Sequence, residues 1–243
     1  MASLPSEPRL RTYIAAVISA GVAAAAPVLV FGHGFDDPVL LVLLLVAGML
    51  GERSMTACFG DSHVSVSALV IMIAAVNGGA RDAVALAVML GIAVNLGNRL
   101  PAYKTAFNVA TYVLSSLALV AVLQASRHVT GAYQIATLST AALADLAVNA
   151  LLVAGAIALS TRRALFGILR NNYGWLAPQY VMFGTLAYVA LLAYSELGAA
   201  SVVVIALPLA AVHVMGMFAA RGIGATTPGT SAARHGVRHA RAA

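Results

Sequence analysis

The stretch IATLSTAALADLAVNALLVAGAIAL, residues 135–159, decides the fold class. It holds one charged residue, Asp145, and an α-helix of this length would extend about 37 Å at 1.5 Å per residue. The hydrocarbon core of a bilayer is about 30 Å thick. The stretch therefore predicts a transmembrane helix.

Seven further apolar runs lie on either side of this stretch. They cover residues 13–31, 38–50, 64–77, 83–97, 106–124, 177–195 and 199–219. The second, third and fourth runs of the chain are shorter than the roughly 20 residues that a crossing needs. Runs 38–50 and 64–77 either cross or form a re-entrant pair, so the sequence predicts an all-α, polytopic transmembrane bundle of six to eight spans.

The composition supports a membrane protein. Of the 243 residues, 61% are hydrophobic and 9% are charged, whereas soluble domains carry roughly a quarter charged residues. The first run is longer than the apolar segment of a signal peptide, so we expect it to stay as a span. One cysteine, Cys58, excludes an internal disulfide and a cluster of thiolate ligands.

The basic residues predict the orientation. Eight crossings with a cytoplasmic N-terminus place 12 of the 14 Lys and Arg residues inside, leaving Arg81 and Arg127 outside. This bias follows the positive-inside rule and predicts that both termini are cytoplasmic, at the bacterial inner membrane. Removing two spans leaves this orientation unchanged.

The chain divides into one membrane domain and a tail. We expect residues 1–225 to form a single transmembrane helical domain and residues 226–243 to be a disordered, basic cytoplasmic tail. The tail has no aromatic residues between its arginines, so nucleic acid is not an expected partner. The expected contacts of the basic residues are anionic lipid headgroups.

Local signals agree with helices. Asp37 before Pro38 predicts a helix start, because the carboxylate caps free N–H groups and proline suits the first helical position. The segment 162–170 mixes arginines with large apolar residues and predicts an interfacial stretch on the cytoplasmic surface. Glu52 and Arg53 are interpreted as an inner boundary.

Polar residues inside two of the long runs are the candidate site. Asp145 lies well inside its run, and Asn149 follows one helical turn later. Asn108, Thr111 and Ser115 form a polar stripe on run 106–124. These five residues predict either a ligand, proton or cation contact in the bundle interior or hydrogen bonds that join helices.

Other polar and small residues have structural interpretations. Asn95 is expected near the inner interface, in contact with water, and His213 as a hydrogen-bonded core residue. A stripe of small residues on the first run predicts close helix packing, either on a partner or, as we prefer, within the chain. Its members are Ala16, Ala20 and Ala24.

Catalytic and cofactor motifs are missing from the sequence. It contains no HExxH, no GxSxG, no glycine-rich phosphate loop and no set of histidines and carboxylates at metal-ligand spacing. We therefore expect a non-enzymatic protein without a cofactor or a metal.

Four features follow one another between Leu50 and Leu123: a VSVS segment, a glycine pair, a basic loop and a phenylalanine-asparagine pair. They are residues 64–67, Gly78 and Gly79, residues 99–104, and Phe107 with Asn108. In this order they resemble the membrane module found N-terminal to HD-GYP phosphohydrolase or GGDEF cyclase domains in bacteria, and the resemblance extends to Asn149 and to the regions around Gly184 and Pro208. It implies a sensory or anchoring module. A short tail stands where an output domain would follow, so no cyclic-dinucleotide role is carried over.

Three hypotheses of function remain. The first is a membrane module that senses a small or lipidic ligand, or anchors a membrane or cytoplasmic partner, through the polar interior near Asn108, Asp145 and Asn149. The second is a small-solute transporter, or the substrate-binding subunit of a vitamin-type uptake system, because the short runs resemble interrupted helices. The third, ranked last, is a lipid-processing enzyme.

Overall fold

The structure is a computed structural model that describes residues 7–34, 37–59, 66–96, 100–129, 131 and 133–201. The regular elements of this part of the chain are all helical. They are α1 (Pro8–Phe31), α2 (Pro38–Phe59), α3 (Ser67–Leu96), α4 (Ala102–Ala125), α5 (Tyr133–Thr161), α6 (Leu165–Asn172), the 3-10 turn η1 (Gly174–Leu176), α7 (Ala177–Leu197) and the 3-10 turn η2 (Gly198–Ala200). Run 199–219, His213 and the tail lie almost wholly outside the described residues.

By length and composition, five helical segments are apolar enough to cross a bilayer, and one of them, in α3, contains a break at Gly79. They are α1, Ser67–Ala93 of α3, α4, α5 and the stretch Leu165–Leu197, and a shorter apolar helix covers Pro38–Glu52. The chain is thus a helical protein with the segments of an integral membrane protein, as predicted. The count of six to eight spans and the orientation stay predictions.

Helix α2 begins as the sequence predicts. The backbone N–H of Leu40 donates to Oδ1 of Asp37 at 2.9 Å, and Pro38 is the first residue of the helix. A carboxylate at this position accepts a hydrogen bond from an N–H group that has no partner within the helix. Its negative charge also interacts favourably with the positive end of the helix dipole.

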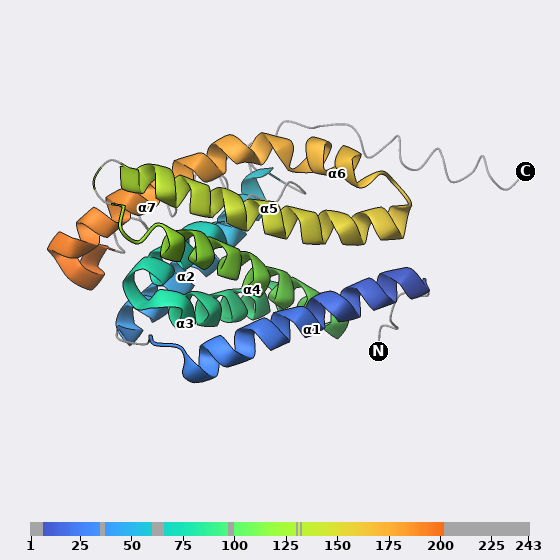
Figure 1. The fold of residues 1–243 in the computed structure, drawn as a ribbon, viewed down its shortest axis with the longest axis horizontal. Coiled ribbons are helices and arrows are strands. Elements are labelled where there is room, and N and C mark those ends of the chain that lie inside the picture. Colours follow the sequence, from blue (N-terminus) through green and yellow to red (C-terminus); the bar gives the residue numbers. More distant parts are fainter. Residues whose placement is uncertain are drawn as a thin grey trace, which may run out of the picture.

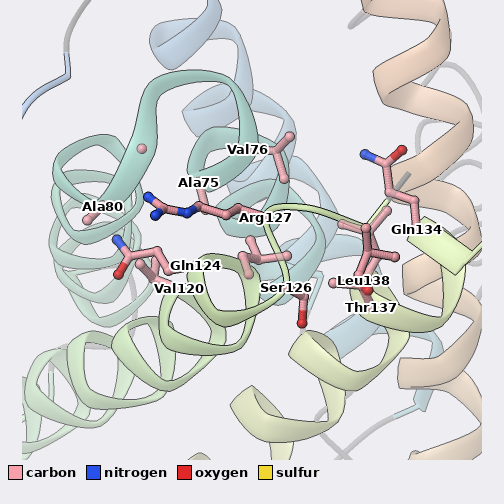
Figure 2. A pocket seen from close by; sticks show the side chains of 13 residues that line it. Ala75, Val76, Ala80, Val120, Gln124, Ser126, Arg127, Gln134, Thr137 and Leu138 are labelled. Carbon is pink, nitrogen blue, oxygen red and sulfur yellow. The ribbon is translucent and has the colours of Figure 1, made fainter. Parts of the chain in front are cut away.

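Helix α3 is two antiparallel arms joined at Gly79. The backbone of Gly79 has φ 83° and ψ −165°, which favours glycine and breaks the helix. A Cβ placed on Gly48 of α2 would lie 2.8 Å from Cδ2 of Leu90 and 3.1 Å from Cγ2 of Val70. In a straight helix Val70 and Leu90 would be about 30 Å apart, so the arms must fold back on each other. Figure 2 shows this bend between Val76 and Ala80.

The two arms explain the short third and fourth runs. The break at Gly79 lies between runs 64–77 and 83–97, as the gap between the runs predicts. The first arm, residues 67–78, is only about 18 Å long at 1.5 Å per residue. Its start at Ser67 therefore lies inside the helical layer, far from the surface at which Gly79 lies.

Helix α4 lies at the centre of the bundle. It packs against α3, α5 and α1, while α7 covers α5 and α2 covers α3 (Figure 1). The largest apolar cluster joins α2, both arms of α3, α4, α5 and α7, and its fully buried members include Leu44, Met72, Leu90 and Leu119.

Helix α1 packs through a different stripe from the one predicted. Its buried residues are Leu10, Ile14, Val17, Gly21 and Ala25, and a Cβ on Gly21 would lie 2.6 Å from Cβ of Ala110 in α4. The preferred prediction, internal packing through the alanine stripe, was wrong, since its first two members, at 16 and 20, are exposed. Packing of the stripe on a partner stays a prediction. Gly21, which directly follows Ala20, lies on the packed face of α1 and allows its close approach to Ala110.

The bundle has two distinct ends. The N-terminus of α1, the start of α4, the end of α5 and α6 lie at one end, which we name the basic end (Figure 1). Its described basic residues are Arg9, Arg11, Lys104, Arg162, Arg163 and Arg170. The other end, which we name the Gly79 end, holds the end of α1, the bend of α3, the connection from α4 to α5 and the end of α7 (Figure 1).

Side-chain contacts hold each end together. At the basic end Arg162 and Glu7 form an ion pair with 3.2 Å between Nη2 and Oε1. At the Gly79 end Tyr194 donates to Oδ2 of Asp37 at 2.8 Å, and Nη1 of Arg81 donates to the carbonyl of Gly32 at 3.4 Å. These contacts join the start of the chain to α5, and the α1–α2 connection to α3 and α7.

Candidate functional site

Asp145 and Ser115, two of the five predicted residues, meet in the interior. Asp145 on α5 is 5% exposed and Ser115 on α4 is 3% exposed, and their side chains are hydrogen-bonded to each other. A carboxyl group at this depth needs a polar partner, because burying it in an apolar medium is costly. Ser115 supplies that partner and links the two central helices.

Tyr180 brings α7 into the same polar region. Its side chain is 2% exposed and lies close enough to Asp145 and to Glu52 to interact electrostatically with both. In the sequence Tyr180 clusters with Tyr173 and Trp175 near the start of run 177–195, where aromatic rings are expected at the headgroup boundary. The structure instead buries the Tyr180 ring in the interior. Its position follows from the packing of α7 against α5.

Glu52 extends this region to α2 and α3. Its Oε1 accepts a hydrogen bond from the backbone N–H of Ser67 at 3.1 Å and another from the Ser67 hydroxyl at 2.7 Å. Glu52 therefore caps the first arm of α3 from a neighbouring helix. The cap gives Glu52 a structural role that the sequence did not predict, and its interpretation as a boundary marker stays a prediction. We name Glu52, Ser67, Ser115, Asp145 and Tyr180 the interior cluster.

The polar stripe of α4 is divided between two partners. Whereas Ser115 meets Asp145, Nδ2 of Asn108 donates to Oδ1 of Asn95 on α3 at 2.7 Å. Asn95 is 3% exposed, so the expectation that water would contact it was wrong. Thr111 donates to the carbonyl of Asn108 in its own helix at 2.8 Å.

Asn149 stands apart from the other predicted residues. It is half-buried, one helical turn from Asp145, and within the described part of the chain no hydrogen bond links its amide to the interior cluster. The structure thus brings together Ser115 with Asp145 and, separately, Asn108 with Asn95. Whether any of the five predicted residues contacts a ligand stays a prediction.

A cavity that the sequence did not predict opens at the Gly79 end. It has a volume of about 330 Å³ and lies between the bend of α3, the end of α4 and the start of α5. Its apolar part includes Ala75, Val76, Val120 and Leu138, and its polar part comprises Gln124, Ser126, Arg127, Gln134 and Thr137. We name it the outer cavity (Figure 2).

Arg127 dominates the charge of the outer cavity. Its side chain extends across the cavity towards Ala75, with Gln124 beside its guanidinium, in Figure 2. It is the one charged side chain among the described lining residues. The negative end of the α4 dipole and the positive end of the α5 dipole both lie nearby and oppose each other.

The polar lining could not be found from sequence alone. Gln124 and Arg127 end α4, while Gln134 and Thr137 begin α5, and side chains in such positions are ordinary at a helix boundary. From the sequence alone, Arg127 contributes only to the count of basic residues on each side of the membrane. The cavity arises because the bend at Gly79 lies against that connection.

Asp37 is an ionisable group at the Gly79 end whose pKa is altered by its hydrogen bonds. The hydrogen bond from the Leu40 amide, and then the one from the Tyr194 hydroxyl, lower the pKa of Asp37 below its usual 3.8. Both bonds favour the charged carboxylate. Asp37 therefore holds the start of α2 against the end of α7 in its ionised form.

The described residues contain no group of three or more His, Cys, Asp or Glu side chains arranged to hold a metal ion.

No protein-family model, curated protein or solved structure matches the chain. The interior cluster and the outer cavity therefore have to be interpreted from their own geometry.

Proposed function

We propose that the chain is a multi-pass protein of the bacterial inner membrane that works, without catalysis, as a sensory or partner-anchoring module. The five long apolar segments support the membrane location. The sensory or anchoring role is supported by the polar interior, where α2, α3, α4, α5 and α7 contribute side chains to one connected region.

The proposed orientation places both termini in the cytoplasm. Six of the described basic residues lie at the basic end, against Arg81 and Arg127 at the Gly79 end, and cytoplasmic ends of membrane proteins are enriched in Lys and Arg. Helix α7 runs towards the Gly79 end (Figure 1). A further crossing by run 199–219 would return the chain to the cytoplasm and place the basic tail there.

The observation that carries this proposal is the burial of Asp145. Its carboxyl group touches Ser115 on one neighbouring helix and lies near Tyr180 on another. A buried carboxyl group with polar neighbours on two other helices is costly to maintain, and such residues within membrane segments are commonly functional.

A native mass spectrum of the full chain from mild detergent tests the proposal, because it reports bound small molecules and bound subunits together. We expect the wild type to retain a molecule or a partner, and D145N and N108A to lose at least about nine-tenths of it. E196Q, which changes an exposed acid at the end of α7, is the control. Unchanged retention in both interior variants, with folding intact, would show that the interior is merely structural.

The transporter hypothesis is kept because of α3. A first arm that starts inside the layer, with a capped N-terminus, resembles the interrupted helices that build substrate sites in transporters. The same mass spectrum separates the two roles. A bound ATPase or a tightly bound vitamin would favour uptake, and a preparation that lacks both while it retains another partner would favour the module.

A further inference from the structure

The outer cavity combines a cation with neutral hydrogen-bonding groups. Arg127 provides up to five N–H donors, two carboxamides and two hydroxyls also line the cavity, and its described lining contains no carboxylate. The remaining wall is built from Ala, Val and Leu side chains. A surface of this kind fits a small molecule that has a negative group at one end and an apolar group at the other.

Arg127 is also unusual in its position along the chain. Among the described basic residues, it and Arg81 are the two at the Gly79 end, where the charge bias of the rest of the chain disfavours a cation. Arg81 has a structural role, because it donates to the Gly32 carbonyl and its Cβ packs close to Gly32. In the described part of the chain no ion pair involves Arg127, and its side chain lies in the outer cavity.

We infer that the outer cavity binds an oxyanion carried on a short apolar tail, with Arg127 as its counter-ion. The carboxylate or phosphate would accept two parallel hydrogen bonds from the guanidinium. Gln124, which lies beside the guanidinium in Figure 2, would contact the remaining polar atoms, and the tail would lie against apolar lining residues such as Val120. The inference deepens the proposed function, since it gives the sensory module a ligand class and an entrance at the Gly79 end.

The volume limits the size of the ligand. Pockets for small molecules measure about 300–1,000 Å³, and the outer cavity, at about 330 Å³, is at the lower limit. A molecule of a few carbon atoms fits this space. The cavity is open to the surface, so we expect affinity in the millimolar range with a strong dependence on charge.

The test uses the full chain in phosphatidylcholine nanodiscs and three probes of equal length: butyrate, butyramide and butylammonium. Saturation-transfer NMR measures each dissociation constant, with empty nanodiscs subtracted. We expect butyrate to bind at least about tenfold more tightly than butyramide, and butylammonium to bind least. R127Q should lower the affinity for butyrate to that for butyramide, R127K should lower it partly, and R163Q at the basic end should leave it unchanged.

A second set of nanodiscs, with half of the lipid replaced by phosphatidylglycerol, separates two sources of the oxyanion. If the natural group is a headgroup phosphate, butyrate binding falls in these discs, and native mass spectra show more phosphatidylglycerol retained by the wild type than by R127Q. If it is a soluble acid, butyrate binding is the same in both lipids. Either result supports an anion site at Arg127.

Equal binding of butyrate and butyramide by the wild type would overturn the inference, as would a folded R127Q protein that binds butyrate like the wild type. Neither measurement needs a partner or a downstream response. Failure here would therefore leave the proposed function standing, because that proposal depends on D145N and N108A.

Discussion

The interior cluster and the outer cavity are both polar regions of an apolar protein, but they differ in how their polar groups are satisfied. In the interior cluster Asp145 has Ser115, and Glu52 has Ser67. In the outer cavity Arg127, Gln124 and Gln134 face open space. Polar groups surrounded by packed helices need partners within the protein, whereas polar groups near water can hydrogen-bond to water until a ligand replaces it. Changes that remove a partner within the first region should therefore lower stability as well as any binding there, whereas changes to the second should affect binding alone.

The largest effect should come from breaking the packing beside the interior cluster. A Cβ added at Gly184 of α7 would lie 2.6 Å from Cα of Ser139 in α5, and backbone there has no room to move. We expect Gly184→Ala to destabilise the protein by about 2–3 kcal/mol through overpacking. Circular dichroism of the protein in mild detergent with increasing amounts of SDS measures the change in the free energy of unfolding.

Gly167→Ala is the matched control for that variant. A Cβ at Gly167 meets nothing within 4 Å, so the change should be neutral or slightly stabilising, because alanine favours a helix. Equal stability of the two variants would show that the α5–α7 contact is looser than described.

Removing the cap on α3 should have the next largest effect. Glu52→Ala leaves the N–H and the hydroxyl of Ser67 without their acceptor, at a cost of about 2 kcal/mol for a buried donor and a lost cap. The same unfolding assay measures it, with Glu196→Ala as a control at an exposed site. If the two variants had the same unfolding midpoint, another group would be accepting the hydrogen bonds of the cap.

Acidification should have the smallest effect and act at the Gly79 end. The Leu40 amide and the Tyr194 hydroxyl lower the pKa of Asp37 below 3.8. The ionised form thus stabilises the folded state above about pH 4, and this contribution is lost as the pH falls through the lowered value. Thermal unfolding at a series of pH values should show that D37N loses less stability on acidification than the wild type.

Y194F sharpens this prediction. It removes one of the two hydrogen bonds to Asp37 and keeps the other, so its acid sensitivity should lie between those of D37N and the wild type. A steeper loss of stability in either variant would contradict the assignment.

The sequence predicted the helices well because hydrophobic runs and helix starts are local properties. The runs 106–124, 135–159 and 177–195 lie within α4, α5 and α7, Asp37 caps α2, and a short helix occupies most of the segment predicted to be interfacial. The break at Gly79 also follows from the gap between two short runs. None of these features depends on which helices become neighbours.

The contacts between helices could not be predicted in the same way. Nothing near Glu52 in the sequence indicates that Ser67 is its partner, and Asn95 meets Asn108 only because the second arm of α3 packs on α4. Ser115 and Asp145 were singled out as polar residues in apolar runs, and that signal was sufficient to find them. The outer cavity forms where three separate segments of the chain meet, and the sequence of any one segment does not indicate a cavity.

The bend at Gly79 has a consequence for how the protein is made. Twelve residues of helix, the length of the first arm, are too few to leave the translocon for lipid on their own, since a stable insertion needs about 20. The first arm has to remain beside the insertion machinery until the second arm has been synthesised. We therefore expect both arms to enter the membrane together. Helix α2, which carries the carboxylate that caps the first arm, would enter with them.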